Sequence, residues 1–351
     1  TQLDQVDLPL ELPGPVEEQN ADGNTAAHYT TVSDAVANAS ADYTVVVGDG
    51  EYREQGAQIG APSNGVTIQA ASGASPVLNI SGSNYLDLGG SDGATVDGLT
   101  FEGDSQNVIA IEDSGSLNAS ITNNEFINFS SGGSDVISLA PGDNNEEELE
   151  ISENIFSGTI DTDAINIDVG NTADGDSVTL SGNTITLAGD HNAINLRNST
   201  GTNNGDADIS LQNNDIDGDG NDATGIAVAT NDLIAGNIDI EGGTIDDVGV
   251  GVDASNNNIG DFLNVTDVTL RNVSQGTPVG VDLTGALGSA TVNIDGLDVD
   301  SSSSATAVSV DDDTADVYLT GSTINDTDTG VLIDDVNNEI VINESNTISH
   351  A

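Results

Sequence analysis

Five side chains with acid–base or cationic chemistry stand in the middle of the sequence: Asp161, Asp163, Asp190, His191 and Arg197. Two carboxylates and a histidine can serve as acid and base on a glycosidic bond, and an arginine can hold a substrate. The first two residues and the last three are separated by about one repeat of the chain, which predicts neighbouring rungs of a coil. The competing interpretation is solvated turn residues, because a chain with 60 acidic residues produces such clusters by chance.

A second cluster offers hard oxygen ligands for a cation: Asp217, Asp219, Asn221 and Asp222. The segment matches the first half of an EF-hand loop, but Ile226 stands at the twelfth position, where that loop needs a glutamate. Ca²⁺ or Mg²⁺ is therefore the cofactor that the sequence allows, and an acidic turn with diffuse cations is the alternative. Cysteine is absent, which excludes disulfides and thiol chemistry.

Both clusters belong to a chain that repeats itself. A corner of the form apolar-x-x-Asn-x-apolar recurs at steps of 24 to 31 residues, and its fourth position is Leu99, Asn124, Asn154, Asn183, Asn214, Gly243, Val273, Leu297 and Ser322. A second series of apolar-x-apolar pairs shares the period and begins at Ile109, Ile137, Ile165, Ile194, Ile226, Val250, Val279, Val308 and Val331. Period-two alternation indicates strands, and this repeat length indicates a solenoid.

One turn per repeat is the arrangement that accommodates such short strands. Each strand then stacks in parallel on its equivalent, about 4.8 Å away, and the Ile and Val positions form interior ladders. We expect a coil of about ten rungs. The corner asparagines are predicted to stack as well, each side-chain amide bonding to the backbone or the asparagine of the next rung, in a ladder of Asn124, Asn154, Asn183 and Asn214.

The segment 29–55 carries a specific resemblance to a known family of proteins. Thr30, Thr31 or Ser33 can cap a short helix with Val32, Ala35 and Val36 inward, and a buried strand, a Gly-Asp-Gly turn and Tyr-Arg-Glu follow. With 66–80 and 94–103, it resembles the first coils of pectin-lyase-like right-handed parallel β-helix proteins. The resemblance covers about 28–348. It implies a single-stranded right-handed β-helix with an N-terminal capping helix, a fold that hosts lyases, hydrolases, adhesins, phage spikes and structural proteins.

The resemblance gives weaker support for an enzymatic function than for the fold. Lyases of this superfamily generally use Arg or Lys as base beside carboxylates that hold Ca²⁺, and the hydrolases carry Gly-His-Gly and Arg-x-Lys elements. This sequence has no Lys and neither element, and Asp161-Thr-Asp163 matches the paired-aspartate rung of the hydrolases only faintly. We therefore expect a protein that is not an enzyme, and a polysaccharide lyase or glycoside hydrolase if it is one.

Charge and composition restrict the setting. The net charge is −57, with three Arg and no Lys, which resembles proteins of extreme halophiles and excludes unaided binding to nucleic-acid phosphates. An acidic ion-binding protein from an ordinary habitat is the alternative. No run of residues is long and apolar enough for a membrane span. The start at Thr1 predicts a secreted, processed chain, and sequons for glycosylation occur at Asn38, Asn79, Asn118, Asn128, Asn198, Asn264, Asn272, Asn325 and Asn343.

The first 27 residues lie outside the repeat and divide the chain into an arm, 1–27, and a β-helix, 28–351. Residues 6–12 alternate, with Val6, Leu8, Leu10 and Leu12 on one face. This arm either packs along its own coil or adds as a strand to a neighbouring copy.

These features lead to three candidate functions. The main expectation is an extracellular structural protein of the cell surface, a homopolymeric filament, sheath or appendage assembled head-to-tail through the arm. The alternatives are a polysaccharide-binding or -cleaving β-helix protein, whose partners are surface glycans, and an adhesin or viral receptor-binding spike.

Overall fold

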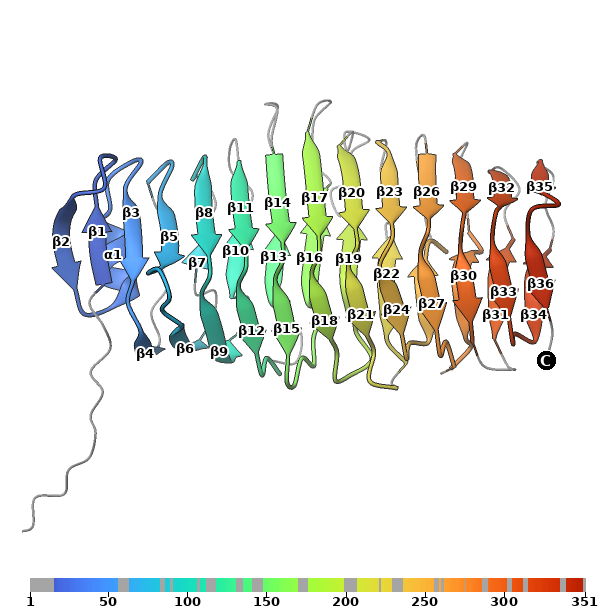
Figure 1. Cartoon of the computed structure of the whole chain (residues 1–351), viewed down its shortest axis with the longest axis horizontal. Coiled ribbons are helices and arrows are strands. Elements are labelled where there is room, and N and C mark those ends of the chain that lie inside the picture. The colour runs from blue at the N-terminus through green and yellow to red at the C-terminus, as the bar shows by residue number, and fades with distance from the viewer. Residues whose placement is uncertain are drawn as a thin grey trace, which may run out of the picture.

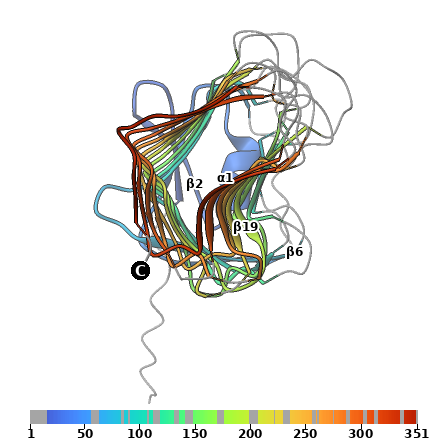
Figure 2. The ribbon, with the colours of Figure 1, turned by 90° about the vertical axis from the view of Figure 1, so that its right-hand side faces the viewer.

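Alternating Val, Ile and Leu residues place one face of each strand inward, and every third strand meets its equivalent from the preceding turn. The computed structural model describes residues 16–55, 63–82, 86–88, 91–105, 108–111, 118–130, 135–140, 148–169, 176–198, 207–220, 222–228, 236–255, 259, 262–274, 276–285, 290–301, 305–311, 315–334 and 339–349. The chain is a right-handed parallel β-helix with three long sheets, here called A, B and C, that enclose one interior (Figures 1 and 2).

Sheet A has 14 strands: β2 (Thr25–Tyr29), β1 (Val16–Gln19), β3 (Thr44–Val47), β5 (Thr67–Ala70), β8 (Ala94–Asp97), β11 (Ala119–Thr122), β14 (Glu148–Ser152), β17 (Ser177–Ser181), β20 (Asp208–Gln212), β23 (Ile238–Glu241), β26 (Phe262–Thr266), β29 (Thr291–Asp295), β32 (Asp316–Thr320) and β35 (Ile340–Ile342).

Sheet B has 12 strands: β4 (Gly50–Gln55), β6 (Pro76–Gly82), β9 (Thr100–Ser105), β12 (Glu125–Ile127), β15 (Ile155–Ser157), β18 (Thr184–Thr186), β21 (Asp215–Asp217), β24 (Thr244–Asp246), β27 (Thr269–Arg271), β30 (Asp298–Asp300), β33 (Thr323–Asn325) and β36 (Thr347–Ser349).

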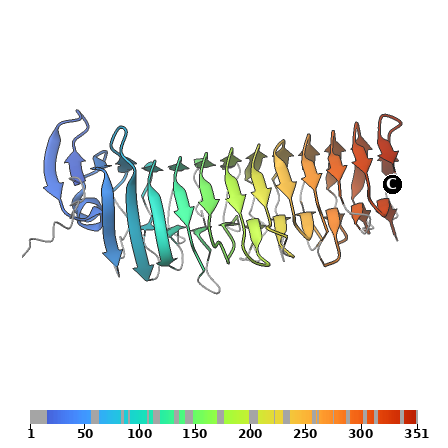
Figure 3. The same cartoon turned by 60° about the horizontal axis from the view of Figure 1, so that its bottom comes forward.

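Sheet C has 10 strands: β7 (Leu86–Asp87), β10 (Ile109–Ile111), β13 (Ile137–Leu139), β16 (Ile165–Asp168), β19 (Asn192–Arg197), β22 (Thr224–Val228), β25 (Val250–Asp253), β28 (Val279–Leu283), β31 (Thr306–Val310) and β34 (Thr329–Ile333). The strands of all three sheets follow one another along the rod (Figure 3). The 12 strands of sheet B show that the rung number differs from the expected ten, because the corner series runs from Leu99 to Ser322, whereas β4 and β6 precede it and β36 follows it.

The N-terminal end of the rod is closed as the sequence predicts. Helix α1 (Val32–Asn38) has Thr31 as its N-cap, whose side chain accepts the Asp34 N–H, and its buried residues are Val32, Ala35 and Val36. The carboxylate of Glu54, only 2% exposed, accepts the Val32 N–H at 2.7 Å and the Ser33 hydroxyl at 2.7 Å. A negative charge at a helix N-terminus is favourable, so the Tyr-Arg-Glu segment fixes the cap to the first turn.

The division at residue 27 differs from the structure. Strand β1 lies within the predicted arm and linker and pairs antiparallel with both β2 and β3. Val16 is fully buried, and Glu18, 6% exposed, accepts the Tyr29 hydroxyl at 2.9 Å. One apolar residue in a polar run gives little alternation, which is why the sequence indicates a linker here. The strand predicted over residues 6–12, with Val6, Leu8, Leu10 and Leu12, lies outside the described residues.

Aromatic side chains stack inside the coil between sheet B strands. Phe101, Phe126 and Phe156 occupy one register position, and Phe126 lies 4.8 Å from the ring of Phe156 and 5.2 Å from that of Phe101. All three are fully buried. The stack adds ring contacts to apolar burial and fixes the register of three successive turns.

We expect Phe126→Ala to lower the free energy of unfolding by about 3–5 kcal/mol, because it removes the middle ring and leaves a cavity between two others. Chemical denaturation monitored by circular dichroism measures the change. Phe262→Ala, at a phenylalanine that is 44% exposed on β26, is the matched control and should change the value by roughly 0.5 kcal/mol or less. Equal losses in both variants would contradict this assignment of the core.

The asparagine corners form a continuous buried ladder. The Oδ1 atom of Asn154 accepts the Asn124 N–H at 3.0 Å, and that of Asn183 accepts the Asn154 N–H at 3.0 Å; Asn214 does the same for Asn183 at 3.2 Å. Each Nδ2 also donates to a backbone carbonyl, as Asn154 does to Ile121 at 2.8 Å. The ladder therefore satisfies backbone groups that the corners leave without a sheet partner.

The ladder ends where its next position is Gly243. A Cβ atom there would lie 2.2 Å from the Asn214 carbonyl oxygen, and the residue has a φ of +78°. Only glycine fits this corner, so the side-chain amide series cannot continue through it.

Candidate functional site

The outer face of sheet C carries a polar row across three adjacent strands. Ser138 of β13, Asn166 of β16 and Asn195 of β19 are in register, so their side chains stand about 4.8 Å apart. Each lies between two inward residues that are buried, such as Ile165 and Ile167. Asn166 is only 3% exposed although it points away from the interior.

Two carboxylates stand beside this row at the start of the strands. The Asn166 Nδ2 group donates to Asp135 Oδ2 at 2.5 Å. Asp163 Oδ1 accepts the Asn192 N–H at 2.8 Å, and its Oδ2 accepts the amides of Asn192 at 3.2 Å and Asn195 at 3.1 Å. These donors hold the Asp163 carboxyl group in one orientation.

The second carboxyl group, that of Asp135, has a raised pKa. Burial raises the pKa of the Asp135 carboxyl, and the neighbouring charge of Asp163 raises it further. Hydrogen bonds from Asn166 and Ser138 and the charge of Arg197 lower it, but the net direction is upward. Unequal environments of two neighbouring carboxyl groups are the arrangement that separates a proton donor from its partner in acid–base catalysis, and here Asp135 is the one with the raised pKa.

We expect Asp135→Asn to stabilise the fold at neutral pH. The folded-state pKa lies above the ordinary value of 3.8, so the ionised carboxylate destabilises the folded state at any pH above that folded pKa. An asparagine removes this penalty and still accepts from Asn166. The gain should therefore be present at pH 7, shrink as the pH falls through the folded pKa and vanish below 3.8, where both states are protonated.

Urea denaturation of both proteins at neutral and acidic pH measures this difference. Asp282→Asn, at another carboxyl whose pKa burial raises, should change stability with the same sign. A variant Asp135→Asn that is less stable than the parent at pH 7 contradicts the assignment.

A histidine completes the group. His191 Nε2 lies 3.3 Å from Asp161 Oδ1, and its Nδ1 lies 3.9 Å from Asp163 Oδ1. The imidazole is 34% exposed and Asp161 is 53% exposed, so both reach solvent. Asp161 can orient the ring by accepting its Nε2–H, which leaves Nδ1 as a proton acceptor beside Asp163.

The arginine lies on the same face but is paired. Arg197 of β19 is in register with Asp168 of β16, and its Nε lies 3.5 Å from Asp168 Oδ2. Asp190 is separate from the histidine's contacts: its Oδ1 accepts the Asp222 N–H of the next turn at 3.0 Å. The structure thus brings together Asp161, Asp163 and His191, places Arg197 near them, and uses Asp190 to fix a turn.

Sequence reasoning missed Asp135, Asn166, Asn195 and Asp168. One signal was available for Asp135, which stands two residues before Ile137 as Asp163 does before Ile165. From the sequence alone, the two asparagines and Asp168 cannot be distinguished from other outward strand residues, because their neighbours depend on the register of the rungs.

The cation candidates do not gather into a ligand set in the described residues. The Asp219 N–H donates to Asp217 Oδ1 at 2.9 Å, which forms a local turn, and Asp222 bonds through its backbone to Asp190. Asn221 lies outside the described residues. No group of three His, Asp or Glu side chains in the part of the chain that the structure describes is placed to hold a metal ion, so Ca²⁺ or Mg²⁺ binding stays a prediction.

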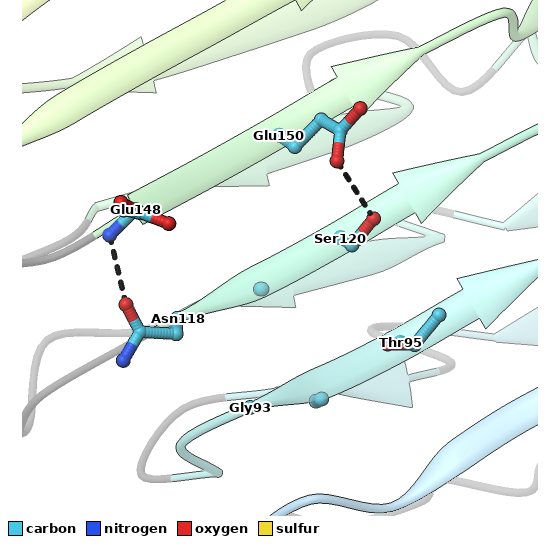
Figure 4. A pocket seen from close by; sticks show the side chains of 8 residues that line it. Gly93, Thr95, Asn118, Ser120, Glu148 and Glu150 are labelled. Carbon is cyan, nitrogen blue, oxygen red and sulfur yellow. Dashed lines mark hydrogen bonds between the residues drawn. The ribbon is translucent and has the colours of Figure 1, made fainter.

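A shallow hollow on sheet A is the competing surface. It has a volume of about 190 Å³ and is lined by residues of β8, β11 and β14, including Asn118, Ser120, Glu148 and Glu150 (Figure 4). Asn118 Oδ1 accepts the Glu148 N–H at 3.0 Å, and the Ser120 hydroxyl donates to Glu150 at 3.3 Å. Its lining holds no His or Arg, so the face of sheet C has the richer chemistry.

The sequons differ in their access to solvent. Asn38, Asn128, Asn272 and Asn343 are exposed, whereas Asn198 is 1% exposed and cannot accept a glycan in the folded chain. The side chains of Asn79, Asn118, Asn264 and Asn325 are half-buried. Within the described residues, no helix combines the length and apolarity that crossing a membrane requires.

Comparison with known proteins supports the fold. No family model and no curated protein matches the sequence. Among solved structures, the A-module of the mannuronan C-5 epimerase AlgE6 from Azotobacter vinelandii is similar with a TM-score of 0.56 and 15% identity, over 87% of this chain and 90% of that one. The PL6 family polysaccharide lyase Pedsa3628 from Pseudopedobacter saltans aligns with a TM-score of 0.36 and 12% identity, over 93% and 92%. The resemblance to right-handed parallel β-helix proteins is thereby confirmed as a likeness of fold.

The same comparison corrects the main functional expectation. The AlgE6 A-module, whose fold this chain resembles, belongs to a polysaccharide-modifying enzyme. The filament subunit is therefore wrong as the main interpretation. The filament interpretation depended on the strand predicted over residues 6–12 and on the lack of a complete catalytic set. The structure adds Asp135, beside Asp163, to the candidate catalytic residues.

Proposed function

We propose that this protein binds a polysaccharide on the outer face of sheet C and cleaves it there. The observation that carries the proposal is the placement of Asp135, Asp163 and His191 on one polar face, where they precede β13, β16 and β19 on three successive turns. Their environments are unequal: Asp135 has a raised pKa, and Asp163 accepts three hydrogen bonds. Such pairs of unlike carboxyl groups are typical of acid–base catalysis.

The geometry assigns a role to each group. The Asp135 carboxyl donates a proton to the leaving oxygen of the sugar chain. His191, oriented by Asp161, accepts a proton through Nδ1. The fixed negative charge of Asp163 stabilises positive charge that develops on the sugar as the bond breaks. The fold similarity to an epimerase module supports a saccharide ligand for this architecture.

The test is the release of new chain ends from polysaccharides. Purified protein is incubated with a panel of plant, algal and microbial polysaccharides in low salt and in molar NaCl, and reducing ends are measured. The parent should release ends from at least one polysaccharide, and Asp135→Asn should release far fewer. A parent that releases none from any polysaccharide, or an Asp135→Asn variant as active as the parent, contradicts the proposal.

A further inference from the structure

We infer that the polysaccharide is an uncharged one and that its glycosidic bond is broken by hydrolysis rather than by elimination. The inference rests on the proposed function and adds the substrate class and the reaction. It is carried by the composition of the face: its described outward row presents carboxylates and no basic residue, and the arginine beside the row is paired with Asp168.

The row on sheet C is short of donors. Asn166 and Asn195 give their Nδ2 groups to Asp135 and Asp163. Their Oδ1 atoms are buried and have no hydrogen-bond partner in the part of the chain that the structure describes. Each Nδ2 group gives one hydrogen to a carboxylate, which settles the orientation of both amides, and the two Oδ1 atoms lie beneath the surface, so the carboxylates are the acceptors that a ligand meets.

The acceptors continue toward the C-terminal end. Beyond Ala227, the same row carries Asp253 and Asp282, which are in register on β25 and β28, and then Ser309 on β31. One oxygen of Asp253 accepts the Ser255 N–H, and one of Asp282 accepts the Thr284 N–H. From Asp87 to Leu332 the described outward row contains no basic residue. A chain of hydroxyl groups complements such a row, because each hydroxyl can donate.

A sugar carboxylate or sulfate, by contrast, would face acceptors and negative charges on this surface. Apart from His191, the only described basic side chain of the site is Arg197, and it is already paired at 3.5 Å with Asp168, whose side chain is 9% exposed. The chain as a whole has a net charge of −57. Salt screens distant charges, since the Debye length is about 3 Å at 1 M, but it does not supply donors for an anion in contact with carboxylates.

An uncharged substrate also decides the reaction. Elimination removes a proton next to a sugar carboxylate, and a neutral sugar has no carboxylate to make that proton acidic. Its glycosidic bond is therefore broken by hydrolysis. The proton of Asp135 passes to the glycosidic oxygen as its bond to the anomeric carbon breaks, a water oxygen bonds to that carbon, and His191 takes the proton from the water.

Affinity electrophoresis and product analysis test the inference together. The protein is run in gels containing xylan, laminarin or glucomannan, and in gels containing polygalacturonate or alginate, each at low salt and in molar NaCl. We expect retardation by a neutral polysaccharide, release of reducing ends from it, and no ultraviolet absorbance from an unsaturated sugar. Asn195→Leu should weaken that retardation about tenfold, and Asn293→Leu, at an outward asparagine of sheet A, should leave it unchanged.

The outcomes separate this inference from the proposed function. Retardation only by polygalacturonate or alginate, with the unsaturated product, overturns the uncharged substrate and leaves polysaccharide cleavage standing. Binding of a neutral polysaccharide that Asn293→Leu weakens as much as Asn195→Leu overturns the assignment to sheet C. Retardation by none of the polysaccharides overturns both the inference and the proposed function.

Discussion

Replacing His191 with alanine is expected to lower the rate of polysaccharide cleavage by about 10²- to 10⁴-fold, the usual contribution of a positioned acid or base. The physical reason is its placement: the ring lies 3.3 Å from Asp161 through Nε2 and presents Nδ1 toward Asp163. The side chain is 34% exposed, so its loss leaves no cavity in the core. The variant should therefore remain folded, and reducing-end release at saturating substrate measures the loss.

A histidine elsewhere in the chain provides the matched control. His28 lies on β2, is 63% exposed and stands 3.8 Å from Glu17. His28→Ala should keep the parental rate. The assignment is wrong if the two variants have the same activity, or if His191→Ala loses its circular dichroism signal along with its activity.

The second large effect concerns stability. Asn154→Leu should lower the free energy of unfolding by roughly 4–8 kcal/mol. Asn154 is fully buried, and its side chain bonds to the backbone N–H and amide of Asn124, the carbonyl of Ile121 and the amide oxygen of Asn183. A leucine of similar size removes these four bonds, at about 1–2 kcal/mol each, although the Asn183 oxygen keeps the backbone N–H of residue 154 and the Asn124 amide keeps the Val96 carbonyl.

Chemical denaturation measures this loss, with Gln212→Leu on the exposed edge of the corner two turns later as the control. Gln212 is exposed and bonds only to the Ser210 hydroxyl among the contacts of its side chain seen in the described residues. Its replacement should change stability by roughly 0.5 kcal/mol or less. An Asn154→Leu variant as stable as the parent shows that the ladder contributes little to the fold.

The fold is largely readable from the sequence because its rules are local and repeated. The corner motif predicts the position of each buried asparagine, and the residue before it, such as Asn123 with a φ of 55° or Gly182 with 63°, takes the left-handed conformation that turns the chain. The cap is readable for the same reason: Thr31 and the inward Val32 and Val36 stand at helical spacing.

The candidate site is less readable because it depends on register between turns. Asp161, Asp163 and His191 are found by residue type, but Asp135 acquires its meaning only when β13 is laid beside β16. The pairing of Arg197 with Asp168 likewise follows from strand register and removes the arginine as a free anion ligand. In so acidic a chain, residue type alone does not separate a carboxylate that does chemistry from one that keeps the surface solvated.

The most direct test of the central claim is a crystal structure of the Asp135→Asn variant with an oligosaccharide of the polysaccharide that the parent cleaves. The account predicts electron density for the sugar on the outer face of sheet C, with a glycosidic oxygen beside position 135 and the anomeric carbon facing His191. Density over the hollow at Glu148 and Glu150 on sheet A, with the face of sheet C empty, would contradict it.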